Sequence, residues 1–222
     1  MTTSLLPFEA VDQAVEQVKP IIERLAKELW QLSELSLQEV KSVQLVMDVL
    51  QEHGFTITSK GTAGIPTAFI GEYGSGTPIL GILAEYDALP GLGNEPVPHQ
   101  EPRKDHVTSG HACGHNLLGA GAIGAALALK NLMAEQKIPG TLRLYGCAAE
   151  ETEGAKVYMA REGLFNDLDR FSVPFRCADL SLLIEQYVRE LTPHFPITHG
   201  DVSYVHTLHP RKVRQGAYLP LT

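Results

Sequence analysis

Two histidines and a cysteine lie within five residues of one another in this chain, as His111, Cys113 and His115. Two adjacent carboxylates, Glu150 and Glu151, follow further along. Imidazole nitrogen, thiolate sulfur and carboxylate oxygen are the ligand types that divalent transition metals select in proteins. Together these residues point to a metal site and to metal-dependent hydrolysis.

The Cys113 and His115 side chains are two positions apart, so in an extended or looped backbone they project to the same side. A lone cysteine is more often a small buried hydrophobe than a ligand, but its histidine neighbours favour a shared ion. His111 lies on that side too, and it is either a further ligand or a structural histidine.

Carboxylates follow two apolar segments that are typical of buried strands. Adjacent glutamates are usually solvated, but Glu150 and Glu151 come after the apolar run Thr141–Cys147 rather than within a charged helix. Asp87 ends the run Ile82–Tyr86, where it is either a turn former or a site residue. Because ligands bind at the carboxyl ends of strands in open α/β sheets, we expect both segments to contribute to one site.

Length and composition restrict the classes of protein that can carry such a site. The chain has 222 residues, 44% of them hydrophobic, and a formal net charge of −8, which predicts a soluble globular protein and argues against nucleic acid as a partner. Three cysteines are too few for a disulfide framework, and the first residues lack a basic leader, so we expect a cytoplasmic protein. The apolar stretch 117–133 includes several glycines and Lys130, and predicts a buried helix rather than a membrane span.

The apolar periodicity predicts helices around a sheet. A stripe at three- and four-residue spacing from Val11 to Leu32 predicts an amphipathic helix that Pro20 kinks or restarts. A second helix is expected to open at Ser36 with a Ser36–Glu39 capping box and to close at Gly54.

β-Branched and aromatic residues predict strands at 55–59, 67–73, 79–86 and 141–147, and prolines and glycines predict an irregular loop at 89–102. A helix capped by Asn116, with a face of small residues for close packing, is expected between the last two strands. The pattern predicts an α/β fold, a three-layer sandwich with a mostly parallel or mixed sheet.

Three segments resemble one family of enzymes: Ala84–Pro90, Gly110–Asn116 and Ala149–Glu151. They are similar to the amidohydrolase branch of the aminoacylase and carboxypeptidase metallopeptidases, the M20 type. Asn116 stands where many amidohydrolases carry Asp, which makes the aminobenzoyl-glutamate hydrolase and dipeptidase-like subgroup the best match. The resemblance covers roughly residues 8 to 169 and implies that this part is a partial metallopeptidase catalytic domain.

The resemblance also implies roles for individual residues. Cys113, His115 and Glu151 would bind metal, Glu150 would be the catalytic base, and Asp87 would be an orienting carboxylate. Glu85 stands where related branches have a ligand histidine, so the cysteine takes over that role. The implied cofactor is zinc or manganese, with two ions in a complete family site. The implied substrate is a small N-acyl amino acid, a dipeptide or an aminobenzoyl-glutamate-type amide, with neither nucleic acid nor membrane as a partner.

The resemblance stops near residue 169, and residues 170–222 are expected to be a divergent tail. A helix at 178–192 is predicted there, and His209-Pro210 resembles a family signature by chance. Two alternatives to a hydrolase remain. One is an inactive, truncated family member that lacks the later metal ligands and the lid domain. The other is a structural zinc site made by His111, Cys113, His115 and one distant donor.

Overall fold

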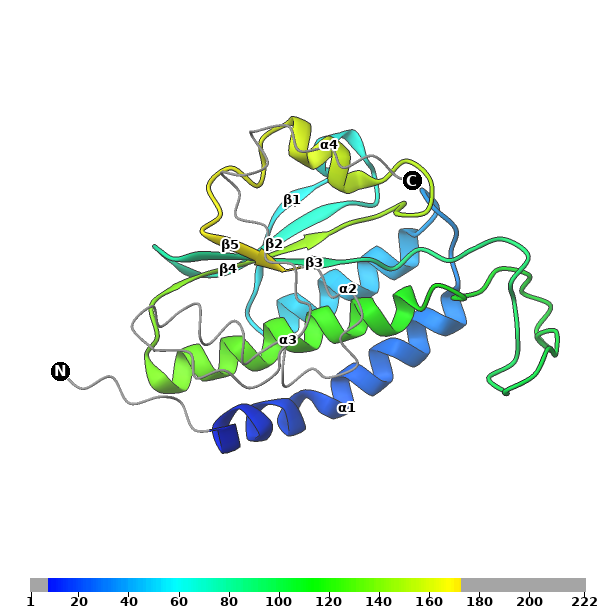
Figure 1. Ribbon diagram of the computed structural model, residues 1–222, viewed down its shortest axis with the longest axis horizontal. Coiled ribbons are helices and arrows are strands. Elements are labelled where there is room, and N and C mark those ends of the chain that lie inside the picture. The colour runs from blue at the N-terminus through cyan, green and yellow to red at the C-terminus, as the bar shows by residue number, and fades with distance from the viewer. Residues whose placement is uncertain (1–7, 173–222) are drawn as a thin grey trace, which may run out of the picture.

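A five-stranded mixed sheet separates two helical layers in the computed structural model, which describes residues 8–172 (Figure 1). Helices α1 (Phe8–Leu32), α2 (Val40–Glu52) and α3 (His115–Gln136) cover one face of the sheet. The short helix α4 (Ala155–Arg161) lies over the other face. This arrangement confirms the predicted three-layer α/β sandwich.

The sheet is mixed, with the strand order β1-β2-β4-β3-β5. Its strands are β1 (Thr56–Lys60), β2 (Phe69–Ser75), β3 (Ile79–Ala84), β4 (Gly140–Gly146) and β5 (Arg170–Ser172). A 3-10 turn, η1 (Thr62–Gly64), joins β1 to β2. Strand β2 is antiparallel to β1 and β4, whereas β3 is parallel to β4 and β5. Because Ala84 pairs with Gly146, the chain leaves β3 and β4 at the same edge of the sheet.

Helix α1 continues through Pro20 as a single element, so the expected restart at this proline is wrong. Its predicted stripe is buried on both sides of the proline, at Val11 and Val18 before it and at Leu25 and Leu29 after it. This stripe packs against α3. Tertiary packing of an apolar face stabilises a helix more than local propensity does, so the helix tolerates the hydrogen bond that proline removes.

Helix α2 begins at Val40, so the predicted start at Ser36 and the capping box are wrong. The Ser36 hydroxyl donates to Asp87 Oδ2 at 2.8 Å instead of capping the helix. The Glu39 carboxylate is buried and accepts hydrogen bonds from residues outside the helix. These long-range partners replace the local cap. The predicted end is confirmed, since Gly54 has a φ of 89°.

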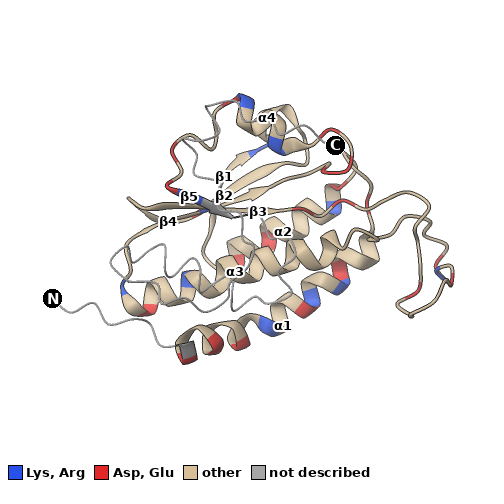
Figure 2. Cartoon of the chain, in the orientation of Figure 1, with Lys and Arg blue, Asp and Glu red and all other residues tan. Residues whose placement is uncertain are grey.

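Helix α3 is the buried core helix that the apolar stretch predicts. It is long and apolar enough to cross a membrane by length and composition alone, but most of it is buried between α1 and the sheet. Figure 2 shows it almost free of charged residues, in contrast to α1. Gly119 permits its close approach to the sheet, because a Cβ atom there would lie 2.3 Å from the Glu85 carbonyl oxygen.

The start of α3 differs from the prediction. Gly114, with a φ of 82°, precedes the first helical residue, His115. Asn116 lies inside the first turn, and its side chain donates to the Ala26 carbonyl of α1 at 3.2 Å. The predicted Asn116 cap is therefore wrong, because this side chain joins two helices instead.

The connection from β3 to α3 is irregular, as predicted, and is fixed by one buried arginine. Arg103 donates to the carbonyl oxygens of Trp30 and Gln31 and to the Ser33 hydroxyl, and it binds both carboxylate oxygens of Asp105. Its guanidinium carbon lies 4.2 Å from the centroid of a Trp30 ring. We call this arrangement the Arg103 anchor. It holds the loop against the end of α1.

Strand β5 directly follows the expected boundary at residue 169 and adds to the sheet beside β3. The predicted helix at 178–192 and the His209-Pro210 pair lie outside the described residues. The division into a domain at 1–169 and a tail at 170–222 stays a prediction.

Candidate metal and catalytic site

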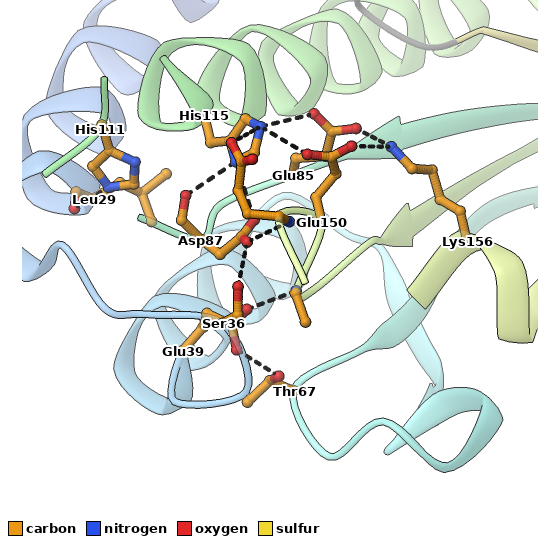
Figure 3. A network of polar contacts seen from close by, with 12 residues as sticks. Leu29, Ser36, Glu39, Thr67, Glu85, Asp87, His111, His115, Glu150 and Lys156 are labelled. Atoms are coloured by element: carbon orange, nitrogen blue, oxygen red, sulfur yellow. Dashed lines mark hydrogen bonds and ion pairs between the residues drawn. The ribbon is translucent and has the colours of Figure 1, made fainter. Parts of the chain in front are cut away.

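The candidate site lies at the edge of the sheet where β3 and β4 end (Figure 3). Glu85 and Asp87 follow β3, Glu150 and Glu151 follow β4, and His115 opens α3. The parallel pairing of the two strands is what brings four carboxylates from separate parts of the sequence to one imidazole. Crevices at the carboxyl ends of parallel strands are the usual ligand sites of such sheets.

Cys113, His115 and Glu151 form a group whose potential ligand atoms all lie within 4.8 Å of one another. His115 Nε2 is 3.8 Å from Glu151 Oε1. This Oε1 atom is buried and has no hydrogen-bond partner among the described residues. A buried carboxylate oxygen without a partner is costly unless a cation compensates it. The group therefore suits a borderline divalent metal with one sulfur, one nitrogen and one oxygen ligand.

Asp87 holds the His115 ring in the orientation that such a site needs. His115 is 2% exposed, and its Nδ1 lies 3.0 Å from both Oδ1 and the backbone carbonyl of Asp87. The Nε2 atom consequently faces the other carboxylates, at 3.4 Å from Glu85, 3.6 Å from Glu150 and 3.8 Å from Glu151. Burial alone would lower the pKa of His115, but the hydrogen bond and charge of Asp87 outweigh it and raise that pKa. Metal-binding histidines commonly have such a carboxylate partner.

The Cys113 thiol lies at the open side of the group, where it is exposed. Local desolvation and the neighbouring carboxylates, first Glu151 and then Glu150, raise its pKa to about 11. The thiolate is thus disfavoured beside these negative charges alone. A divalent cation would reverse the balance, because it stabilises the thiolate directly.

Glu150 lies beside the group without being a member of it. Its Oε2 is 3.6 Å from His115 Nε2, and its side chain is 28% exposed, so it faces both the imidazole and solvent. Burial raises the pKa of Glu150, while the charge of Lys156 opposes that rise. A carboxylate whose pKa moves towards neutrality is suited to accept and return a proton.

The turn after β4 contains Glu150 and Glu151, and the buried carboxylates of Glu39 and Asp87 hold its backbone. Ala149 has a φ of 52°, a left-handed conformation that costs a non-glycine residue about 1 to 2 kcal/mol. Its N–H donates to Glu39 Oε1 at 2.7 Å, and the Glu151 N–H donates to Asp87 Oδ2 at 3.1 Å. The Thr67 hydroxyl donates to the other Glu39 oxygen at 2.8 Å. Strained residues persist where surrounding contacts fix them, and they cluster at functional sites.

The charge of the site is unbalanced. Four carboxylates lie within 4 Å of His115, those of Glu85, Asp87, Glu150 and Glu151. Lys156 pairs with two of them, Glu85 and Glu150 (Figure 3). Even with His115 protonated, negative charge exceeds positive charge. This surplus is a second reason why a divalent cation suits the site.

His111 is not brought into the site. The described residues contain two groups of potential ligands, Cys113 with His115 and Glu151, and Glu85 with His115 and Glu150, and His111 lies outside both. Its Nε2 is 3.0 Å from the Leu29 carbonyl, its Nδ1 lacks a partner among the described residues, and burial lowers its pKa. This position favours the structural interpretation of His111 and weakens the alternative of a zinc site that includes it.

The structure thus brings together the three expected ligands, the expected base and the expected orienting carboxylate. Their individual roles stay predictions. Sequence reasoning missed Lys156 and the contribution of Glu39. The signal for Lys156 was its position as the one basic residue between Arg143 and Arg161, just after the acidic pair. Glu39 gave no such signal, because its partners are 28 and 110 residues away.

Residues 81–210 match the Peptidase family M20/M25/M40. The chain belongs to this family. The matched range contains every residue of the site except the supporting Ser36, Glu39 and Thr67, and it extends beyond residue 169, where the sequence resemblance was expected to stop.

Curated relatives in the family are considerably longer than the part that aligns. The chain is 37% identical over 162 residues to a subunit of the p-aminobenzoyl-glutamate hydrolase of Escherichia coli strain K12, covering 73% of this chain and 34% of that protein. It is 29% identical over 177 residues to the Xaa-Arg dipeptidase of Homo sapiens, covering 72% of this chain and 36% of that protein. The chain therefore spans about a third of the length of these relatives.

A solved structure from the family shares this architecture. The Bacillus subtilis YXEP protein, described as a dinuclear metal binding peptidase from the M20 family, superposes with a TM-score of 0.59 at 27% identity. The alignment covers 70% of this chain and 42% of that protein. The fold around the candidate site is thus that of part of an M20 catalytic domain.

Proposed function

We propose that this chain carries the metal-binding and proton-transfer side of an amidohydrolase active site. The substrate class is an N-acyl amino acid, a dipeptide or an aminobenzoyl-glutamate-type amide. The observation that carries the proposal is the convergence of Cys113, His115 and Glu151 beside a separate carboxylate, Glu150. Membership of the family supports this proposal.

Cys113, His115 and Glu151 would hold the metal, and the sulfur ligand favours zinc, with manganese as the second choice. A divalent cation bound there would lower the pKa of the attacking water and polarise the amide carbonyl. Asp87 keeps the free nitrogen of His115 directed at the other two ligands. The side chains of Cys113, His115, Glu151 and Asp87 lie close together in the fold.

Glu150 would transfer the proton. It is close to the ligand group but is not needed within it, so one oxygen can accept a proton from the attacking water. The same carboxyl group can then return this proton to the leaving amine. General acid–base catalysis of this kind contributes about 100- to 10,000-fold to a rate.

The substrate class rests on the shared chemistry of the relatives. Their names refer to p-aminobenzoyl-glutamate and to Xaa-Arg dipeptides, which have in common an amide bond next to an amino acid. Free thiols at Cys113 and Cys147 support a reducing compartment, and we propose the cytoplasm.

The test compares Glu150→Gln with Glu153→Gln, an exposed glutamate three residues away. Bound zinc and manganese are measured by atomic spectrometry after gel filtration. Release of amine is measured from p-aminobenzoyl-glutamate, an N-acyl amino acid and a dipeptide. We expect Glu150→Gln to keep its metal and to lose about 100-fold or more in turnover, and Glu153→Gln to keep both.

Two results would contradict this proposal. Turnover that Glu150→Gln leaves unchanged would remove Glu150 from the reaction. Metal binding without turnover in the unaltered chain would favour the second candidate, a partial domain that binds metal but does not catalyse.

A further inference from the structure

Lys156 lies between two carboxylates of the candidate site. Its ammonium group pairs with Glu85 Oε1 and lies 3.8 Å from Glu150 Oε1 (Figure 3). Glu85 is 7% exposed at its side chain, and its second oxygen lies 3.4 Å from His115 Nε2. Glu85 therefore connects the lysine to the imidazole. The lysine is a built-in cation within a cluster of acids.

The position of this ammonium group is fixed by the start of α4. The N–H groups of Gly154 and Ala155 donate to the carbonyl oxygens of Ala149 and Ala148, at 2.7 and 3.2 Å. Ala155 and Met159 of the same helix are buried in the core. Helix α4 is thus hydrogen-bonded to the turn that contains Glu150, and this holds Lys156 next to that turn.

Lys156 stays positively charged in this environment. Burial alone would lower its pKa, but the charges of Glu85 and Glu150 outweigh burial and raise that pKa. Its side chain is 24% exposed. The ammonium group is therefore a lasting charge in the site rather than a group that switches near neutral pH.

The described residues contain two groups of potential metal ligands, and they share one residue. The first is Cys113, His115 and Glu151, and the second is Glu85, His115 and Glu150. Since Nδ1 of His115 is hydrogen-bonded to Asp87, only Nε2 remains for an ion. The two groups consequently compete for a single ion. In the second group, an ammonium cation already lies on the two glutamates.

We propose that Lys156 is a positioning residue that keeps Glu85 and Glu150 out of the ligand set of the metal and so leaves Glu150 available as the base. The inference rests on the proposed function for the role of Glu150. In this proposal, Lys156 determines which of the two ligand groups binds the ion. Without the ammonium group, Glu85 and Glu150 would bind the metal ion at His115. The ion would then have more ligands, but Glu150 would no longer be available to accept the proton.

The test measures metal affinity and turnover in the full chain with Lys156→Met and Lys156→Arg. Zinc affinity is measured by competition with a chelating dye, and kcat and KM are measured for the amide substrates. We expect Lys156→Met to bind zinc about tenfold more tightly or better, because carboxylate ligands are freed, while kcat falls and KM changes little. Lys156→Arg keeps the positive charge and should restore both values towards those of the unaltered chain.

A purely structural role would move both readouts in the same direction, since a loosened site binds metal more weakly and also turns over more slowly. Zinc affinity that is unchanged or weaker in folded Lys156→Met overturns the inference. Should that variant fail to fold, Lys156→Gln serves the same comparison, and circular dichroism checks the fold of each variant. The double variant Glu85→Gln/Lys156→Met should lose most of the gain in affinity.

The experiment also separates this inference from the proposed function. If the unaltered chain binds zinc without turnover, the proposed catalysis fails, but the comparison of affinities still decides the role of Lys156. If Lys156→Met leaves affinity unchanged while Glu150→Gln abolishes turnover, the proposed function stands and the inference about Lys156 fails. A matched control is Lys130→Met, a lysine of α3 near the Tyr73 ring, which should change neither zinc affinity nor kcat.

Discussion

The Arg103 anchor and the candidate metal site each contain buried charged side chains, but they are built in opposite ways. Arg103 is 4% exposed, and its guanidinium donors find acceptors in two backbone carbonyls, one hydroxyl and one carboxylate. One positive charge meets one negative charge. At the candidate site, carboxylates outnumber cations, and one buried oxygen of Glu151 has no hydrogen-bond partner among the described residues.

This difference separates a structural charge from a functional one. Buried polar groups in stable proteins are almost always hydrogen-bonded, and buried charges are paired. The anchor follows that rule and fixes a loop. The metal site departs from it at the atoms where a cation would bind.

Removal of the shared ligand should affect metal binding most. His115→Ala should weaken zinc affinity by more than about 100-fold, a larger loss than removal of an outer partner of a metal ligand causes. The matched control is His111→Ala, which removes a histidine of the same segment that lies outside both ligand groups. Competition titration with a chelating dye measures both. Equal losses in the two variants would contradict the assignment of the site.

Removal of the anchor should instead affect stability. Arg103→Met loses hydrogen bonds of a charged donor, each worth about 1.5 to 3 kcal/mol, so the free energy of unfolding should fall by about 2 to 4 kcal/mol in chelator-treated protein. Zinc affinity should stay within about twofold. Lys104→Met, an exposed neighbour with 79% of its side chain accessible, is the control for urea denaturation. A loss of affinity as large as that in His115→Ala would remove the distinction between the two regions.

Substitution of the carboxylate that orients His115 should give an intermediate effect. Asp87→Asn can still accept a hydrogen bond from the imidazole, but its amide NH2 would face the Glu151 N–H, where both groups are donors. Zinc affinity should fall by about 10- to 100-fold, as is typical for partners of metal ligands. Asp48→Asn, on the exposed side of α2, should leave it unchanged. Affinity equal to that of the control would show that Asp87 does not orient the ligand.

The substitution Glu39→Gln should change stability the least, because the hydrogen-bond partners of Glu39 are the neutral Thr67 hydroxyl and Ala149 N–H. A glutamine can bond both of them. Burial raises the pKa of Glu39, so the native state binds the proton more tightly than the unfolded chain does. Its contribution to stability is therefore present at low pH and is lost as the pH rises above the ordinary value of 4.5. Glu39→Gln should gain stability relative to the unaltered chain over that range. Urea denaturation at several pH values measures the difference, and a difference that does not change with pH contradicts it.

The sequence predicts most of the fold, because strand and helix patterns are local. The expected strands at 67–73 and 79–86 begin and end close to the observed bounds of β2 and β3. The convergence of Cys113, His115 and Glu151 also follows from local motifs together with strand direction. The strand and helix patterns depend on neighbours along the chain, and the convergence depends in addition on the parallel pairing of β3 with β4.

Local rules misplace Ser36, Glu39 and Asn116 for one shared reason. Each is a residue type that these rules assign to a helix cap, and each instead bonds a partner that is distant in sequence: Asp87, Ala149 and Ala26. A cap is worth about 1 kcal/mol, which is close to the net contribution of an ordinary hydrogen bond, so a partner distant in sequence can replace it. Lys156 could not be placed for a similar reason, since its partner Glu85 comes from another strand end.

Gly119 has no chemistry of its own, yet it sets the spacing between the two halves of the site. A methyl group there would meet the backbone oxygen of Glu85 at 2.3 Å, so α3 and the end of β3 would have to separate. His115 moves with the first, and Glu85 and Asp87 move with the second. Alanine normally favours a helix, but Gly119→Ala would therefore appear in a genetic screen as a defect in metal binding, although it alters no ligand.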